Sequence, residues 1–511
     1  MAGIDEETPK LAARKDVSHR GGDKTGDFLS SKQTMIENLI QAQSTEERSI
    51  HDILVDFGTP FLSLAVLDEG KITAKVIGCP DAHEMTDSVA TNVLDNDTIF
   101  QAASISKPIT AMAVMKLCQE GALDLDTPIS KYISQEQLAW ISNPITLPLV
   151  SQITLRHLFS HTSGLSCHGF TGYATVPIPT IEQILRGELP ANNEKITMSV
   201  LPGQKFCYSG GGITVIQLIL ETHIKKPFPE IMDEMVLKPL QMTRSTFKFL
   251  PATEKNYAPA HLNGRQVATP DHYSLPESAA AGLWTTPTDL LKAIRAMQRS
   301  LESDDFLERR WAQEMLTEVG DFGFGIGWRV KKEDIQFGHA GDNDPGYACF
   351  VAGYAELPTG KDEVPRESSH LVPKNCGICV MTSSRLGAVV YQKIVAAIAY
   401  LKHWPAIPEL QGVPFMDRKK TIDGKAKEWC GSWGSGDWTL VEKNDALLIQ
   451  CGTFSEMSLV PAALPSHSYD EGSSIDLVVD GLEMMLRLGW KDKSPIIEVW
   501  QDEGISTLER R

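Results

Sequence analysis

The chain has 511 residues, of which 42% are hydrophobic and 22% are charged, the composition of an ordinary globular protein. This length is enough for about two or three domains. Its formal net charge of −18 disfavours binding to nucleic acid or to an anionic membrane, because phosphate groups would be repelled. No run of about 18 apolar residues could cross a bilayer, and no N-terminal apolar stretch of about 7–15 residues suggests a secretory signal. We therefore expect a cytoplasmic protein.

The N-terminal segment differs in composition from the rest of the chain. Residues 1–30 are rich in Lys, Asp, Glu and Gly and could not bury enough apolar area to fold, which predicts a disordered tail. Apolar residues then recur at helical spacing from Met35 towards Ile53, which indicates an amphipathic helix. Residues 61–67 and 71–77 are predicted to form the two strands of a hairpin.

A short strand and a helix follow, and two polar residues lie where they meet. Residues 97–103 are short and apolar and lead directly into Ser104. Apolar residues at helical spacing over 109–118 mark one face of a helix that ends at Gly121. Ser104 is therefore expected at the entry from strand to helix, with Lys107 one turn inside.

The middle of the chain is predicted to be helical, and strands return after it. Residues 153–294 read as several helices joined by long loops, strands follow at 347–354 and 377–382, and a helix covers 389–401. Strands at both ends with helices between them indicate one sheet built from both ends of a domain. This is an α+β arrangement with a helical subdomain, predicted over residues 31–404.

A linker over 405–420 and a C-terminal domain over 421–511 complete the predicted organisation. Short strand-like runs separated by Gly, Asp and Asn turns indicate a small antiparallel sandwich or barrel. The predicted strands of this domain are 429–433, 438–441, 446–451, 474–479, 483–488 and 496–500.

The sequence gives no sign of a metal site, an organic cofactor or a disulfide framework. Nine cysteines are scattered along the chain, and only Cys376 and Cys379 form a C-x-x-C pair, with no second pair near them. The acidic stretch 342–346 lacks the spacing of a calcium loop and is predicted to be a turn. The glycines at 210–212 are not followed by the Lys-Ser/Thr of a phosphate-binding loop.

Ser104 and Lys107 are the strongest candidates for chemistry. Three residues apart on the first helical turn, their side chains share one face. The partial positive charge of the helix N-terminus favours an alkoxide on Ser104 and a neutral Lys107. A neutral lysine can accept the hydroxyl proton, which is a general way to activate a serine nucleophile.

Four motifs occur in order: residues 100–110, 155–165, 201–210 and 338–341. They resemble the nucleophile segment, a loop-shaping segment, the Tyr-x-Asn loop and the Lys-Thr-Gly strand of the serine β-lactamase and penicillin-recognising family. Within this family, the nucleophile segment resembles the class C branch and its relatives, the related esterases, D-aminopeptidases and acyltransferases. The resemblance implies a β-lactamase/transpeptidase-like domain, an antiparallel sheet flanked by helices, with an appended C-terminal β-barrel-like domain. No catalytic role is assigned to His161, which lies in the loop-shaping segment.

The resemblance also implies roles for residues beyond the Ser-Lys pair. Tyr208 would place its phenolic oxygen between Ser104 and Lys107 and act as base and later as acid. Which of Lys107 and Tyr208 holds the proton stays open.

The motif at residues 338–341 implies a substrate-binding strand. His339 would orient the substrate or form a hydrogen bond near the nucleophile, and Gly341 would let the substrate lie close against the strand edge. The backbone N–H groups of Ser104 and Asp342 would be the two oxyanion donors.

Two positions depart from the family pattern. Gly210 stands where the family has the Asn of Tyr-x-Asn, and His339 stands where it has a Lys, which removes a cation for a β-lactam carboxylate. With no export signal, these departures favour an esterase, amidase or acyltransferase over a resistance enzyme.

We therefore predict a serine hydrolase that forms an acyl-enzyme on Ser104 with an ester, thioester or amide of a small intracellular compound. The alternatives are an acyltransferase and a non-catalytic scaffold of the same fold, although intact Ser104, Lys107 and Tyr208 argue against the scaffold. A small-molecule acyl substrate is the predicted partner, and the sequence does not indicate an oligomeric state.

Overall fold

The computed structural model describes most of the chain between residues 54 and 510. The predicted tail and the helix expected from Met35 towards Ile53 lie outside the described residues. The described residues are 54–55, 57–78, 94–262, 265–266, 270–331, 335–356, 375–384, 386–402, 404, 415–416, 421–422, 424–434, 436–444, 446–451, 456–463, 475–480, 484–491, 494–501 and 504–510.

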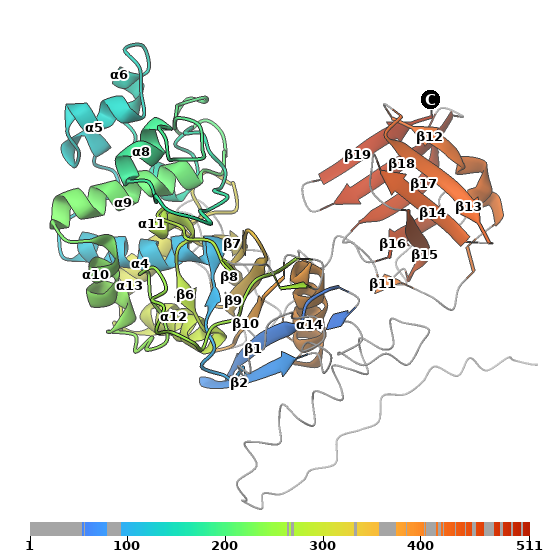
Figure 1. Cartoon of the computed structure of the whole chain (residues 1–511), viewed down its shortest axis with the longest axis horizontal. Helices are drawn as coiled ribbons and strands as arrows, with labels where there is room; N and C mark the ends of the chain where they lie inside the picture. The colour runs from blue at the N-terminus through green and yellow to red at the C-terminus, as the bar shows by residue number, and fades with distance from the viewer. Residues whose placement is uncertain are drawn as a thin grey trace, which may run out of the picture.

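An antiparallel sheet of six strands, in the order β2-β1-β10-β9-β8-β7, forms the centre of the first part of the molecule. The hairpin β1–β2 pairs with β10, so strands from both ends of the domain share one sheet, as predicted (Figure 1). The strands are β1 Phe61–Asp68, β2 Lys71–Gly78, β7 Arg329–Lys331, β8 Gln336–Asn343, β9 Tyr347–Tyr354 and β10 Gly377–Thr382.

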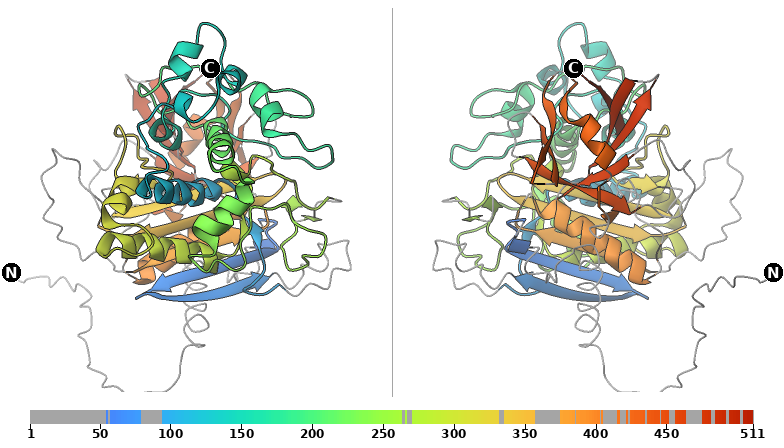
Figure 2. Two further views of the ribbon diagram at one scale, coloured as in Figure 1. Left: turned by 90° about the vertical axis from the view of Figure 1, so that its left-hand side faces the viewer. Right: turned by 90° about the vertical axis from the view of Figure 1, so that its right-hand side faces the viewer.

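Helices cover both faces of this sheet. Alternate residues of each strand point to opposite faces, and both faces are apolar. On one face, Leu64 and Ile378 pack in a buried cluster with Ile394 of α14 (Gly387–Lys402). On the other face lie α12 (Pro287–Glu302) and α4 (Ser106–Gln119), which belong to the largest buried cluster (Figure 2). Lys107, at the start of α4, is on this second side, and Ser104 lies directly before this helix.

The remaining helices form the predicted helical subdomain, of which α5, α6, α8 and α9 lie above α4 in Figure 1. Several of these helices begin with a side-chain cap, for example at Thr154 and Thr180, whose hydroxyls accept a backbone N–H. The helices are α5 Gln135–Trp140, α6 Leu147–Val150, α7 Leu155–Phe159, α8 Ile181–Arg186, α9 Gly210–Ile224, α10 Phe228–Met232, α11 Ser278–Ala281 and α13 Arg309–Leu316, with short turns η1 Ala103–Ile105, η2 Ile129–Lys131 and η3 Asp233–Leu237.

Two small sheets lie beside this subdomain. The strand predicted at 97–103 is reduced to β3 (Phe100–Gln101), which pairs with β6 (Trp284–Thr285). β4 (His261–Leu262) pairs with β5 (Arg265–Gln266).

The C-terminal sheet is a nearly closed barrel of eight antiparallel strands in the order β12 to β19. A bridge between Trp433 and Arg510 brings the first strand to the end of the last. Its own buried cluster includes Trp433, Leu477 and Ile497. The strands are β12 Gly431–Trp433, β13 Trp438–Lys443, β14 Ala446–Cys451, β15 Met457–Ala463, β16 Ile475–Val479, β17 Met485–Lys491, β18 Ser494–Gln501 and β19 Gly504–Glu509.

Several details of this barrel differ from the sequence-based expectation. β15 and β19 were not predicted, and the strand expected over 429–433 is shorter, because its first residue belongs to a 3-10 helix, η6 (Gly424–Trp429), and β12 begins at Gly431. β11 (Phe415–Met416) falls inside the expected linker yet pairs with β15. The domain boundaries themselves stay a prediction.

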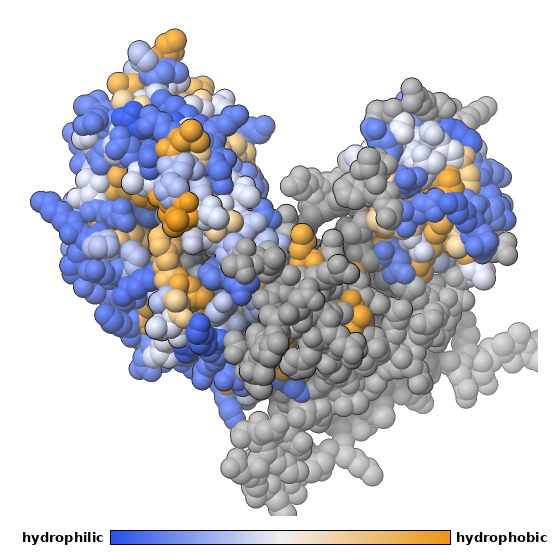
Figure 3. All heavy atoms as spheres, viewed as in Figure 1, coloured by the Kyte–Doolittle hydropathy of each residue, from blue (hydrophilic) through white to orange (hydrophobic). Residues whose placement is uncertain are grey.

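The described surface is largely polar. Hydrophilic residues cover most of the coloured atoms in Figure 3, with separate hydrophobic spots among them. Ile145, Val176 and Leu189 are the most exposed large apolar side chains, each more than four-fifths exposed. Within the described ranges, no helix combines the length and apolar character needed to cross a bilayer.

Candidate active site

The side chains of Ser104 and Lys107 meet at the start of α4. Ser104 lies in η1 and is half-buried, whereas Lys107 is 2% exposed. The Lys107 Nζ atom donates to Ser104 Oγ at 2.8 Å and to the carbonyl oxygen of Ala280 in α11 at 2.9 Å. The structure thus brings together the two residues that the sequence pairs, with the amine aimed at the hydroxyl.

Burial changes the proton affinity of Lys107. Desolvation lowers its pKa to about 7, and the nearby charge of Asp342 partly opposes this shift. Cys167 would oppose it as a thiolate, but burial raises the pKa of that thiol to about 11, so it carries no charge at neutral pH. A large fraction of Lys107 is therefore neutral near pH 7, when it can accept a proton.

The turn that carries Ser104 is held by hydrogen bonds from its backbone. Ala103 has a φ of +48°, a region that non-glycine residues rarely occupy. Its carbonyl oxygen accepts a hydrogen bond from the hydroxyl of Ser106 at 2.6 Å, and the same hydroxyl accepts the N–H of Leu283 at 3.0 Å. These bonds fix the sharp entry into α4 and with it the direction of the Ser104 side chain.

Tyr208 lies over this pair. Its ring centroid is 5.0 Å from Lys107 Nζ, and its hydroxyl interacts with Ser104. Two imidazole rings stack on it, His161 at 4.1 Å and His168 at 4.7 Å between centroids. Desolvation raises the pKa of Tyr208, and the hydrogen bond with Ser104 only partly opposes this. The resting residue is therefore a neutral phenol rather than a phenolate.

Strand β8 passes directly against the backbone of Ser104. A Cβ atom on Gly341 would lie 2.7 Å from the carbonyl oxygen of Ala102 and 2.8 Å from the Ser104 nitrogen, so only glycine fits. Asp342 follows, with an exposed side chain whose charge acts on Lys107. The two expected oxyanion donors, at Ser104 and Asp342, therefore lie at the closest approach of β8 to the nucleophile turn.

His339 lies on β8 near Tyr208 and is buried. Its Nδ1 donates to the carbonyl oxygen of Ala340 at 2.5 Å, and desolvation lowers its pKa to about 3, helped by the charge of Lys107. His339 is therefore neutral, as the substitution for Lys suggested. The charge of Arg329 on β7 nevertheless lowers the pKa of both His339 and Tyr208, so a cation is close to the site, which sequence analysis missed.

Gly210, at the start of α9, has no room for the asparagine that the family carries. An added Cβ would lie 3.0 Å from the carbonyl oxygen of His168 and 3.1 Å from the ring of Phe170. The N–H groups of Gly210 and Gly211 donate to the carbonyls of His168 and Cys167 at 3.1 Å each. The loop of residues 166–170 thus occupies the space of the missing side chain.

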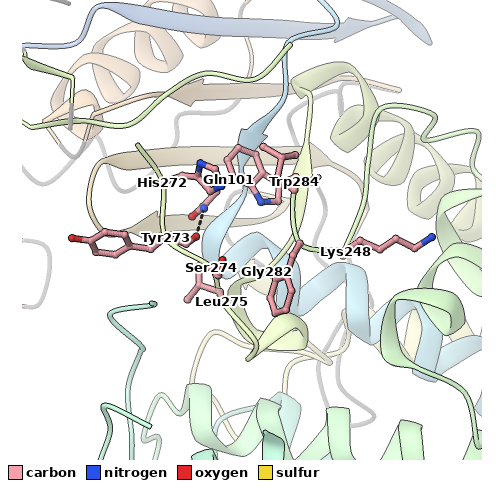
Figure 4. Close-up of a pocket in the computed structure, with 10 residues that line it drawn as sticks. Gln101, Lys248, His272, Tyr273, Ser274, Leu275, Gly282 and Trp284 are labelled. Carbon is pink, nitrogen blue, oxygen red and sulfur yellow. Dashed lines mark hydrogen bonds between the residues drawn. The ribbon is translucent and has the colours of Figure 1, made fainter. Parts of the chain in front are cut away.

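A pocket opens between β3, β6 and the loop after β5. Gln101 in this pocket lies three residues before Ser104, donates to the carbonyl oxygen of Tyr273 and accepts from the amide of Asn343 (Figure 4). The bond from Asn343 connects β3, directly before Ser104, to the end of β8, and the bond to Tyr273 connects β3 to the loop after β5. The lining residues are Gln101, Lys248, Phe249, Leu250, His272, Tyr273, Ser274, Leu275, Gly282 and Trp284.

The other sequence-based expectations concern residues away from the site. Cys376, just before β10, and Cys379, within β10, are both buried. Of the turn predicted over 342–346, residues 344–346 form a turn, whereas Asp342 and Asn343 are the last two residues of β8. Among the residues that the structure describes, no group of three or more His, Cys, Asp or Glu side chains could hold a metal ion.

Comparisons with known proteins place this geometry in a family. The chain is 26% identical over 251 residues to the esterase EstB of Burkholderia gladioli, an alignment covering 42% of this chain and 61% of that relative. It is 27% identical over 226 residues to the D-alanyl-D-alanine-carboxypeptidase/endopeptidase AmpH of Escherichia coli, covering 44% of this chain and 54% of the relative. The chain thus matches between 54% and 61% of the length of these relatives.

A solved structure has the same fold over nearly the whole chain. The octameric penicillin-binding protein homologue from Pyrococcus abyssi superposes with a TM-score of 0.58 and 20% identity, covering 93% of this chain and 99% of that one. The family model for beta-lactamase matches residues 45–392, well over half of the sequence. The chain therefore belongs to the beta-lactamase family.

Proposed function

We propose that this protein is a serine hydrolase that forms an acyl-enzyme on Ser104 from an ester, thioester or amide of a small molecule. The observation that carries the proposal is the 2.8 Å contact from Ser104 Oγ to Lys107 Nζ, an amine whose pKa burial lowers to about 7. A buried, partly neutral lysine beside a half-buried serine is suited to proton transfer and costs free energy to bury without such a role.

In the acylation step, Ser104 Oγ attacks the carbonyl carbon while its proton moves to neutral Lys107. The carbonyl π electrons move to the oxygen, which the N–H groups of Ser104 and Asp342 stabilise. The C–O, C–S or C–N bond then breaks, and the leaving group takes a proton. Water attacks the acyl-enzyme by the reverse sequence of proton transfers and releases the acid.

Lys107 and Tyr208 divide the proton transfers in this proposal. Lys107 can lose its proton near pH 7, whereas the raised pKa of Tyr208 keeps its phenol protonated. Lys107 is therefore the base towards Ser104, and Tyr208 is the acid towards the leaving group. The sequence left open whether Lys107 or Tyr208 holds the proton, and in this proposal Lys107 accepts it from Ser104.

The neutral His339 suggests which kind of group the substrate presents to β8. His339 provides a hydrogen-bonding ring without charge, so it suits a neutral polar group of the substrate. An acyltransferase would use the same acyl-enzyme with an alcohol, amine or thiol in place of water. Adding such acceptors to a working assay separates the two reactions, since transfer changes the product without changing the acylation rate.

The test is active-site labelling with a fluorophosphonate, together with turnover of p-nitrophenyl butyrate. We expect one adduct, mapped to Ser104 by peptide mass, and loss of adduct and turnover in Ser104→Ala. Ser151→Ala is the matched control, because Ser151 lies in the helical subdomain and its hydroxyl bonds only Pro148 among the described contacts. An unlabelled native protein without turnover would overturn the proposal and favour the scaffold alternative.

A further inference from the structure

His161 is a buried histidine that contacts the segment carrying Tyr208 at three points. Its ring stacks on Tyr208, with centroids 4.1 Å apart and planes inclined by 31°. Its Nδ1 atom accepts the backbone N–H of Ser209 at 3.2 Å. Its carbonyl oxygen accepts the N–H of Cys207 at 2.7 Å. One residue therefore holds the backbone on both sides of Tyr208 and the face of its ring.

We propose that His161 is a positioning residue for Tyr208 and controls proton transfer to the leaving group. The inference rests on the proposed function, in which Tyr208 is the acid. Phe324 supports the arrangement, because its ring packs edge-on against His161 at 5.3 Å and limits tilting of the imidazole. The contacts of His161 described above are with the Tyr208 segment and with Phe324 rather than with a substrate, so His161 acts through Tyr208.

The imidazole has to be neutral for this role. Since Nδ1 accepts a hydrogen bond, the ring proton belongs on Nε2. Burial and the charge of Lys107 both hold the pKa of His161 well below its usual range. A charged ring at this position would repel protonated Lys107, whereas the neutral ring offers a stacking surface and an acceptor without that cost.

The backbone of His161 gives independent support. Its φ is +57°, in the left-handed region that residues other than glycine rarely adopt. This conformation places the carbonyl and the ring of one residue towards the same segment. Asparagine tolerates the left-handed region and carries an oxygen close to the position of Nδ1, so His161→Asn is the conservative variant.

The experiment compares two esters of the same acid in variants of the full chain. An aryl ester with a weakly basic leaving group needs little protonation, whereas an alkyl ester needs an acid. We expect His161→Ala to lower kcat on the alkyl ester about 10- to 100-fold, with a smaller loss on the aryl ester and little change in KM. His161→Asn should recover part of the loss, and His223→Ala, at an exposed histidine of α9, should be unchanged.

A double-mutant cycle with Tyr208→Phe tests whether His161 acts through the Tyr208 hydroxyl. If His161 acts through Tyr208, removing His161 from the Tyr208→Phe protein should cost less than about 3-fold. Equal losses with and without the Tyr208 hydroxyl, or equal losses on both esters, would overturn the inference while leaving Ser104 labelling intact. If His161→Ala melts at a lower temperature than the native protein, the double-mutant cycle is measured with His161→Asn instead. Failure of Ser104 labelling in the native protein would instead overturn the proposed function, and this inference with it.

Discussion

The two halves of the candidate site are built in different ways. Ser104 and Lys107 belong to one helical turn, and bonds from the Ser106 hydroxyl to Ala103 and from the Lys107 amine to Ser104 fix their geometry. Tyr208 instead depends on side chains from the distant loop 161–173, chiefly the rings of His161 and His168. The proposed nucleophile and base are therefore brought together by a local turn, which the Ala280 carbonyl oxygen and the Leu283 N–H support. The proposed acid, by contrast, is placed by packing between segments.

The largest expected effect comes from replacing Lys107, the proposed base on the helical turn. Lys107→Met should lower kcat/KM by about 10²- to 10⁴-fold, because it removes the amine that contacts Ser104 Oγ, and the raised pKa of Tyr208 keeps its phenol protonated and unable to act as the base. Native kcat/KM should rise as pH increases through about 7, since the protonated amine cannot accept a proton. The variant should lose this rise.

Lys116→Ala is the control for that measurement. Lys116 lies on the same helix, but its Nζ donates to the carbonyl oxygen of Phe306, away from Ser104. An unchanged pH profile in Lys107→Met would show that the turn does not supply the base, and the contrast between the two halves would fail.

A second prediction tests whether backbone contacts alone hold the nucleophile side. In Gly341→Ala the new methyl group would press on the Ser104 nitrogen and on the carbonyl of Ala102, which displaces the oxyanion donor. We expect a loss of kcat of about 10²-fold, the usual cost of one such donor. Gly489→Ala is the control, because nothing lies within 4 Å of a Cβ atom there. Steady-state kinetics near the native level in Gly341→Ala would contradict the close approach of β8.

The smallest effect concerns stability, on the side of the distant loop. Glu277 is fully buried near Tyr173, whose hydroxyl lies 3.5 Å from the carboxyl group, and burial raises the pKa of Glu277 to about 7. The folded protein therefore keeps this proton between pH 4.5 and 7, where the unfolded chain loses it. Stability contributed by this group falls as pH rises through that window, by about 3 kcal/mol in total.

Glu277→Gln removes this pH dependence. The variant should be more stable than the native protein at pH 8, by up to about 3 kcal/mol, and equally stable near pH 4.5. Chemical denaturation across this pH range measures the difference. If the free energy of unfolding changes with pH in the same way in both proteins, the ionisation of Glu277 does not contribute to the pH dependence of stability.

The contrast between the two halves also explains what the sequence could predict. Alternating apolar residues located β1, β2, β9 and β10, and the spacing of Ser104 and Lys107 placed them on one face of a turn. These signals are local, because strand and helix periods fix which neighbours share a face.

Contacts between distant segments left no comparable signal. The stacking of His161 on Tyr208 joins residues 47 positions apart and depends on a left-handed backbone that histidine rarely adopts. Arg329 acts on His339 only because β7 pairs with β8. β15 was missed since Pro461 interrupts a short apolar run, and prolines are typical of loops.

The pairing of β1 with β10 affects how the protein folds during its synthesis. Ala65 faces Cys379 across this ladder, so the two strands are separated by more than 300 residues of chain. Almost the whole domain must therefore be synthesised before the β1–β2 hairpin can pair with β10. Until then the unpaired edge of β1 can associate with other nascent chains. Such long-range closure slows folding, so expression at low temperature or with chaperones favours the native sheet over aggregation.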